Sequence, residues 1–167
     1  MKNLVKIAFG GGCHWCTEAV FQALKGVEKV EQGYVASVAG NSSFSEAVIV
    51  HFDEDVIKVE VLMEIHLLTH NSASNHAMRT KYRSAIYIFS EAQKFEVNLA
   101  LNRIKANASE KIITSVLEFS AFEPSREAIQ NYYQKNPSKP FCERYIAPKL
   151  KMLQQQFSEV YQIRTIK

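Results

Sequence analysis

The chain has 167 residues, 47% of them hydrophobic, and 20 lysine and arginine residues against 17 acidic residues give it a net charge of +3. This size and composition predict a single domain spanning residues 1–167, and so small a charge makes a nucleic-acid partner unexpected. We expect neither a membrane-spanning segment nor a signal peptide, because the apolar runs are short and Lys6 interrupts the first of them. Three cysteines are too few for a secreted disulfide scaffold, so a reducing cytoplasm is the expected location.

The first part of the chain predicts a strand, a helix and a second strand. The apolar run Leu4–Phe9 is expected to form the first strand, and Lys29–Ser37 the second. Between them, His14–Leu24 carries apolar residues at helical spacing, and Gly26 follows where the helix is expected to end. These elements form one strand–helix–strand unit.

A second unit of the same kind follows. Ala47–Phe52 and Ser84–Phe89 are predicted strands, and Val56–Leu68 is a predicted helix with Asp55 as its N-cap residue. Two such units in succession predict an α+β fold, the ferredoxin-like βαββαβ two-layer sandwich, in which helices cover a sheet.

Additional helices and a C-terminal extension are expected beyond these two units. Residues Ser90–Ala106 form a predicted helix that starts with a capping box, and Ile112–Phe119 is a predicted strand. A short helix is expected over Pro124–Lys135, with the proline in its first turn. The segment Pro148–Ile163 has apolar residues on one helical face, which we expect to pack against the protein's own core.

Residues 10–16, Gly-Gly-Gly-Cys-His-Trp-Cys, are the strongest functional signal in the chain. The glycines allow a sharp turn after the first strand, and Cys13 then stands at the start of a helix. Free backbone N–H groups and the positive end of the helix dipole stabilise a thiolate at such a position. We therefore predict that Cys13 is a reactive thiol rather than a packed structural one.

Cys16 follows Cys13 by three residues and would lie beside it on a helix. The pair fits a dithiol redox centre of the thioredoxin type, or half of a metal site. His66 and His70 are spaced to share a helix face. Because the sequence offers no second cysteine pair or histidine cluster to complete four ligands, no metal site is expected.

Trp15 and Cys142 are further candidates. Trp15 is the only tryptophan and lies between the two sulfurs in sequence, where an aromatic wall would suit a small apolar group attached to sulfur. Packing under the sheet is the alternative for this side chain. Cys142 follows a stretch rich in turn residues, which predicts a movable loop from which a resolving thiol attacks a sulfenic acid.

Several motifs, taken in order, resemble those of one known family. Gly10–Glu18 is similar to the Gly-Cys-Phe-Trp signature of the peptide methionine sulfoxide reductases of the A type. The further matches are Leu24–Val27, Gly33–Tyr34, Ser45–Val48, Phe52–Asp53, Tyr82–Tyr87 and Gln134–Pro137, followed by Cys142. The chain thus resembles a divergent member of that family, whose βαββαβ-type core agrees with the predicted layout.

The resemblance implies roles for three catalytic residues. Cys13 matches the nucleophile that attacks the sulfoxide sulfur, Glu46 matches the acid that protonates the sulfoxide oxygen, and Tyr82 matches a tyrosine that binds this oxygen. The oxygen is a poor leaving group until it is protonated, so an acid must stand opposite the thiolate. Glu46 must then hold a proton near neutral pH, for which we expect apolar surroundings.

The resemblance also implies a substrate pocket and a resolving thiol. Trp15 matches one wall of the pocket for the S-methyl group, and His14 stands in this pocket where the family usually has phenylalanine. Cys142 matches the resolving cysteine, and Cys16 is a possible second thiol because it is so near Cys13 in sequence.

The function implied is the thiol-dependent reduction of methionine S-sulfoxide, peptide-bound or free, through a sulfenic acid on Cys13 and an intramolecular disulfide. The family implies no metal or organic cofactor, and thioredoxin as the reductant. Two alternatives stay open. One is a general dithiol–disulfide oxidoreductase built on Cys13 and Cys16, and the other is a redox-sensing or sulfoxide-binding relative without turnover.

Overall fold

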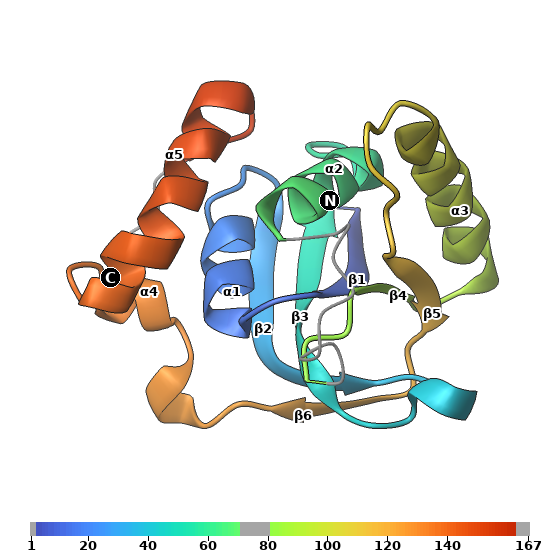
Figure 1. Ribbon diagram of the computed structural model, residues 1–167, viewed down its shortest axis with the longest axis horizontal. Helices are drawn as coiled ribbons and strands as arrows, with labels where there is room; N and C mark the ends of the chain where they lie inside the picture. Colours follow the sequence, from blue (N-terminus) through green and yellow to red (C-terminus); the bar gives the residue numbers. More distant parts are fainter. Residues whose placement is uncertain (1–2, 71–80, 163–167) are drawn as a thin grey trace.

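The computed structural model describes residues 3–70 and 81–162, and within them a six-stranded sheet has the order β5-β4-β1-β3-β2-β6 (Figure 1). The strands are β1 (Leu4–Gly10), β2 (Val27–Ala36), β3 (Ser45–Asp53), β4 (Ala85–Ile88), β5 (Ser115–Glu118) and β6 (Ala121–Pro124). Neighbouring strands are antiparallel except β4 and β5. The four central strands, β4-β1-β3-β2, alternate with two helices as the ferredoxin-like prediction requires, so the predicted fold class is confirmed.

Helices cover one face of this sheet. They are α1 (His14–Gln22), α2 (Val59–Thr69), α3 (Glu91–Ala106), α4 (Tyr132–Lys135) and α5 (Ala147–Gln156). A π-helical segment at Cys142–Ile146 leads into α5. The C-terminal helix α5 stands beside α1 and away from α3 (Figure 1), so the C-terminal segment is brought to the helix that carries the cysteine motif.

Successive side chains along the strands point alternately into two hydrophobic cores, one on each face of the sheet. Ile7 and Phe9 of β1 face the helices, whereas Ala8 between them faces the other side of the sheet. On that second side, Phe119 and Phe122 pack against the sheet. Because β1 is a central strand covered on both faces, its last residue, Gly10, is buried, and the cysteine motif that follows starts from a fixed point.

The strand predicted over Ile112–Phe119 is shorter than expected, and a second strand follows it. After β5 the chain passes within two residues to β6 on the opposite edge of the sheet. The N–H of Phe119 donates to the carbonyl of Ile88 (2.9 Å) and that of Ser120 donates to the carbonyl of Ala36 (3.0 Å), so this crossing joins the ends of β4 and β2. It also places the Phe119 ring over the second core.

The prediction of a helix over Pro124–Lys135 is wrong. Pro124 is the last residue of β6, and only a 3₁₀ turn and the four-residue α4 follow it. Asn131 separates them with a φ of 57°, which interrupts helical geometry. The N–H groups of Asn131 and Tyr132 donate to the Glu18 carboxylate instead of to helix carbonyls.

The N-cap prediction for α2 is also wrong. The helix begins at Val59, with Lys58 as its N-cap residue, rather than after Asp55. Asp55 instead donates its N–H to the Asp53 side chain (3.0 Å) in a turn that precedes the helix. Ile57, which was predicted to lie in the helix, belongs to this turn and is buried there, with 2% of its surface exposed.

Two other helix predictions hold with adjusted ends. Ser90 is the N-cap residue of α3 and accepts a hydrogen bond from the N–H of Gln93 (3.1 Å), which confirms the predicted helix start. The helix α5 ends at Gln156, and Ile163 lies outside the described residues. Leu150 and Leu153 of α5 are buried in the main core, as expected of its apolar face. None of the helices in residues 3–70 and 81–162 combines the length and apolar character needed to cross a membrane.

Candidate active site

Cys13 lies between the end of β1 and the first turn of α1. It is the N-cap residue of this helix, and its carbonyl accepts the N–H groups of Cys16 and Thr17 (3.1 and 3.2 Å). A hydrogen bond from the Cys16 thiol lowers the pKa of Cys13, and backbone N–H groups of Trp15 and Cys16 lower it further. Burial and the ionised form of Glu46 act in the opposite direction but do not cancel this effect. The surroundings therefore favour a thiolate on Cys13.

Glycines before Cys13 let the loop approach its neighbours closely. Gly11 has a φ of +151°, and a Cβ there would collide with the His70 imidazole. A Cβ at Gly10 would lie 3.0 Å from the carbonyl oxygen of Glu46. The Nε2 atom of His66 donates to the carbonyl of Gly10 (2.8 Å). His66 of α2 and His70, the C-cap residue of this helix, thus contact the loop. In the described part of the chain no group of three or more potential ligands is placed to bind a metal ion.

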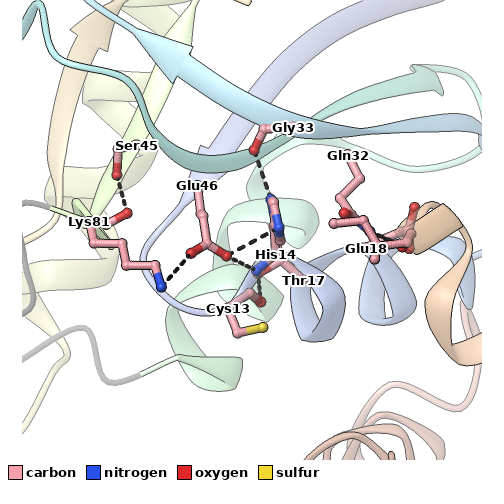
Figure 2. A network of polar contacts seen from close by, with 10 residues as sticks. Cys13, His14, Thr17, Glu18, Gln32, Gly33, Ser45, Glu46 and Lys81 are labelled. Carbon is pink, nitrogen blue, oxygen red and sulfur yellow. Dashed lines mark hydrogen bonds and ion pairs between the residues drawn. The ribbon is translucent and has the colours of Figure 1, made fainter. Parts of the chain in front are cut away.

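Glu46 on β3 is 6% exposed and reaches the start of α1 (Figure 2). Its Oε1 accepts the backbone N–H of His14 (3.3 Å) and lies 3.2 Å from the Nε2 of the same residue. Its Oε2 lies 3.6 Å from the Nζ of Lys81. The prediction of apolar surroundings for Glu46 is therefore wrong, because His14 and Lys81 are polar partners of its two carboxyl oxygens.

His14 is the first residue of α1 and is 3% exposed. Its Nδ1 lies 2.8 Å from the carbonyl oxygen of Gly33, and its ring meets Tyr34 edge to face at 5.2 Å. Burial lowers the pKa of His14, while the Gly33 carbonyl and the charge of Glu46 act in the opposite direction. This imidazole is thus a buried bridge between strand β2 and Glu46 on β3.

Lys81 links Tyr82 to Glu46, because its side chain contacts both residues. The Nζ of Lys81 is 5.1 Å from the centre of the Tyr82 ring, and a hydrogen bond to Tyr82 raises the pKa of Lys81. The backbone carbonyl of Lys81 also accepts the N–H of Glu46 (3.0 Å). Tyr82, Lys81 and Glu46 therefore form one group next to the start of α1.

Trp15 points to the C-terminal segment. Its ring stacks on Tyr132 of α4, with centroids 4.1 Å apart and planes 14° from parallel. Phe141 meets it at right angles from 5.2 Å. The residue predicted to line a substrate pocket thus also forms the contact surface for the segment that leads to Cys142.

The three thiols are free and lie in one region. Cys16 donates to Cys13, and this contact, burial and the charge of Cys13 raise the pKa of Cys16, to which Cys142 also contributes. Cys142 is fully buried at the start of the π-helical segment, so the prediction of a movable loop around it is wrong. It follows the turn residues directly, but its own side chain is part of the main core.

Sequence reasoning missed two members of this site. The Lys81 ammonium lies 3.6 Å from Oε2 of Glu46, and the Tyr132 ring stacks on Trp15. Lys81 directly precedes the matched motif that begins at Tyr82, which is a weak signal for its position. Tyr132 lies 117 residues from Trp15 and two residues before the matched motif Gln134–Pro137, but this motif gave no signal for a contact with Trp15.

The chain is similar to known proteins over most of its length. Residues 5–161 match the family model described as "Peptide methionine sulfoxide reductase". The peptide methionine sulfoxide reductase MsrA of Acinetobacter baumannii (strain AYE) is 34% identical over 166 residues, which cover 91% of this chain and 95% of that protein. The MsrA of Pasteurella multocida (strain Pm70) is 34% identical over 167 residues, covering 92% of this chain and 96% of that protein.

Solved structures share the fold. Mxr1 from Saccharomyces cerevisiae in its reduced form has a TM-score of 0.70 at 22% identity, covering 83% of this chain and 89% of that one. Mxr1 in complex with Trx2 has a TM-score of 0.61 at 20% identity, covering 77% of this chain and 84% of that one. With the match to the family model and the two relatives above, the chain belongs to the peptide methionine sulfoxide reductase family.

Proposed function

We propose that this protein reduces methionine sulfoxide, with Cys13 as the nucleophile and Glu46 as the acid. The observation that carries this proposal is the position of Cys13 at the N-terminus of α1, within electrostatic reach of the buried Glu46 carboxyl group. A thiolate and a proton donor side by side are what oxygen removal from a sulfoxide needs. The relatives reported above bear the name of this activity.

The reaction proceeds in two steps. The Cys13 thiolate attacks the sulfoxide sulfur while Glu46 gives its proton to the oxygen, and methionine leaves as the hydroxyl group passes to Cys13 as a sulfenic acid. A second thiol then attacks the Cys13 sulfur and forms a disulfide, and its proton leaves with the hydroxyl group as water. The group of Lys81 and Tyr82 beside Glu46 supports Tyr82 as a ligand of the oxygen.

Cys16 is the thiol that condenses first, because it already donates a hydrogen bond to Cys13. Cys142 then attacks Cys16, frees Cys13 as a thiolate and leaves a Cys16–Cys142 disulfide. The charge of Cys142 contributes to the raised pKa of Cys16, which supports this order because it places Cys142 within electrostatic reach of Cys16. Cys142 must leave the core to react, which exposes the disulfide to a reductant.

Thioredoxin is the reductant that fits this scheme, and no metal or organic cofactor takes part in it. A thiol cycle of this kind needs a compartment that keeps cysteines reduced, and we therefore place the protein in the cytoplasm. The existing complex of Mxr1 with Trx2 supports thioredoxin as the partner, because that protein has the same fold.

The test is turnover of separated sulfoxide epimers, free and in a peptide, with dithiothreitol as the reductant. We expect the wild type to convert the S epimer over many cycles, Cys13→Ser to be inactive, and Glu46→Gln to be slower by about 10²-fold or more. Multiple turnover by Cys13→Ser would contradict the proposal. Failure of the wild type on both epimers would leave only a binding or sensing role.

A dithiol–disulfide oxidoreductase is the second candidate, favoured by the hydrogen bond between Cys16 and Cys13. This activity does not use Glu46. Reduction of insulin disulfides by the wild type, with an unchanged rate in Glu46→Gln, would favour this candidate over sulfoxide reduction.

A further inference from the structure

Two contacts fix the protonation pattern of the buried His14 ring. A backbone carbonyl oxygen only accepts hydrogen bonds, so the Nδ1 atom of His14, 2.8 Å from the Gly33 oxygen, must carry a hydrogen. In a neutral imidazole the other nitrogen, Nε2, is then a bare acceptor. This Nε2 lies 3.2 Å from Oε1 of Glu46. Without a proton between them, two lone pairs would face each other in a buried site.

Two of the other groups that face this pair favour a deprotonated carboxyl group. The Lys81 ammonium lies 3.6 Å from Oε2, and the backbone N–H of His14 donates to Oε1. The negative charge of Cys13 on the α1 side acts against a second negative charge on Glu46, and Tyr34 on β2 presents only its ring to His14. Among the described contacts of the carboxyl group, Nε2 is therefore the one that requires a proton on Glu46.

We propose that His14 and Glu46 hold a single proton between Nε2 and Oε1, and that His14 is the positioning residue that keeps Glu46 protonated as an acid. This inference rests on the proposed function, because it assigns the source of the proton that the sulfoxide oxygen takes. Per turnover, the Glu46 proton and the thiol proton of Cys16 leave with the oxygen as water. The His14–Glu46 pair is reset by one proton from solvent.

Two variants of His14 separate its two ring nitrogens. His14→Asn keeps an N–H group at the position of Nδ1, facing Gly33, but removes the acceptor that faces Glu46. His14→Gln places an amide near the position of Nε2, where its N–H group stabilises a carboxylate instead of an acid. A merely structural role through the Gly33 bond would spare the Asn variant, whereas proton sharing predicts a defect in both.

The first measurement is the nitrogen NMR spectrum of the His14 ring in the reduced protein. We expect the neutral tautomer with hydrogen on Nδ1 and none on Nε2. In Glu46→Gln the ring should gain its second proton only at lower pH than in the wild type, because an amide, unlike the carboxyl group, cannot pass its proton to Nε2 and become the counter-charge of the imidazolium. A neutral ring with hydrogen on Nε2 would overturn the proposal.

The second measurement is the pH profile of kcat/KM for sulfoxide reduction. For both His14 variants we expect the alkaline limb to move to lower pH by about one unit, so that activity falls about tenfold above this limb and is nearly unchanged at acid pH. A loss equal at every pH, or profiles identical to that of the wild type, would overturn the proposal. The ring tautomer is read without turnover, so it judges the proton pair even if sulfoxide reduction itself fails.

Discussion

The buried carboxylate of Glu18 accepts the backbone N–H of Tyr132 at 3.2 Å and so ties the segment after β6 to helix α1. It also accepts the N–H of Asn131 (3.0 Å) and the side-chain amide of Gln32 (2.9 Å). Tyr132 is the residue whose ring stacks on Trp15. One carboxylate thus holds the C-terminal segment against the helix that carries the reactive thiol.

Removing this carboxylate should destabilise the fold. Glu18→Ala leaves the two backbone N–H groups and the Gln32 amide without their acceptor, and we expect a loss of about 3 kcal/mol in the free energy of unfolding. Glu18→Gln, the matched control, keeps one acceptor oxygen and should lose about 1 kcal/mol. Urea denaturation measures both. Equal stability of the Ala variant and the wild type would contradict the assigned anchoring role.

The same residue should make stability depend on pH. Burial raises the pKa of Glu18 in the folded protein above the roughly 4.3 of an unfolded chain. Between these two values the folded state binds more protons, so the contribution of Glu18 is greatest below the unfolded value and falls as the pH rises through the folded value. Since Glu18→Gln does not titrate, we expect the stability of the wild type relative to this variant to fall as the pH rises above about 4. A difference that stays constant with pH would contradict this.

The thiol of Cys16 should control the reactivity of Cys13. Cys16→Ala removes the hydrogen bond that contributes most to the lowered pKa of Cys13, whereas Cys16→Ser keeps a hydroxyl donor. The pKa of Cys13 then rises in the Ala variant, so less thiolate is present at neutral pH. Alkylation of Cys13 by iodoacetamide, followed by mass spectrometry, should be slower by about tenfold in Cys16→Ala and converge with the wild type at high pH. Identical rate–pH curves would show that this hydrogen bond is unimportant.

Local patterns were enough to predict the central fold and the position of Cys13 at the start of a helix. The apolar pattern of β1 and the glycines after it predict that Cys13 stands at a helix N-terminus. This prediction needs only the ten consecutive residues 4–13. Contacts between distant segments were not predictable in this way. Glu18 and Asn131 are 113 residues apart, yet their hydrogen bond helps replace the predicted helix over Pro124–Lys135 by two short turns.

In the candidate site, too, residues that belong to local motifs were predictable and contacts between distant segments were not. Cys13, Glu46 and Tyr82 could be named from motifs, and the fold brings them to the same end of the sheet. The partners of Glu46 could not, because His14 is 32 residues away in sequence and Lys81 comes from the loop before β4. A polar ring at position 14 is therefore explained by the strand opposite it rather than by its neighbours in the chain.

Trp15, the only tryptophan, should report the movement of the C-terminal segment. Its ring packs on Tyr132 and Phe141, and Phe141 directly precedes Cys142. Because Cys142 is buried, its reaction with Cys16 must displace this segment and expose the indole. One equivalent of sulfoxide should then shift the fluorescence of the wild type to longer wavelength. In Cys142→Ser, oxidation stops at the Cys13–Cys16 disulfide and the shift should be absent, whereas an equal shift in this variant would contradict the two-step transfer.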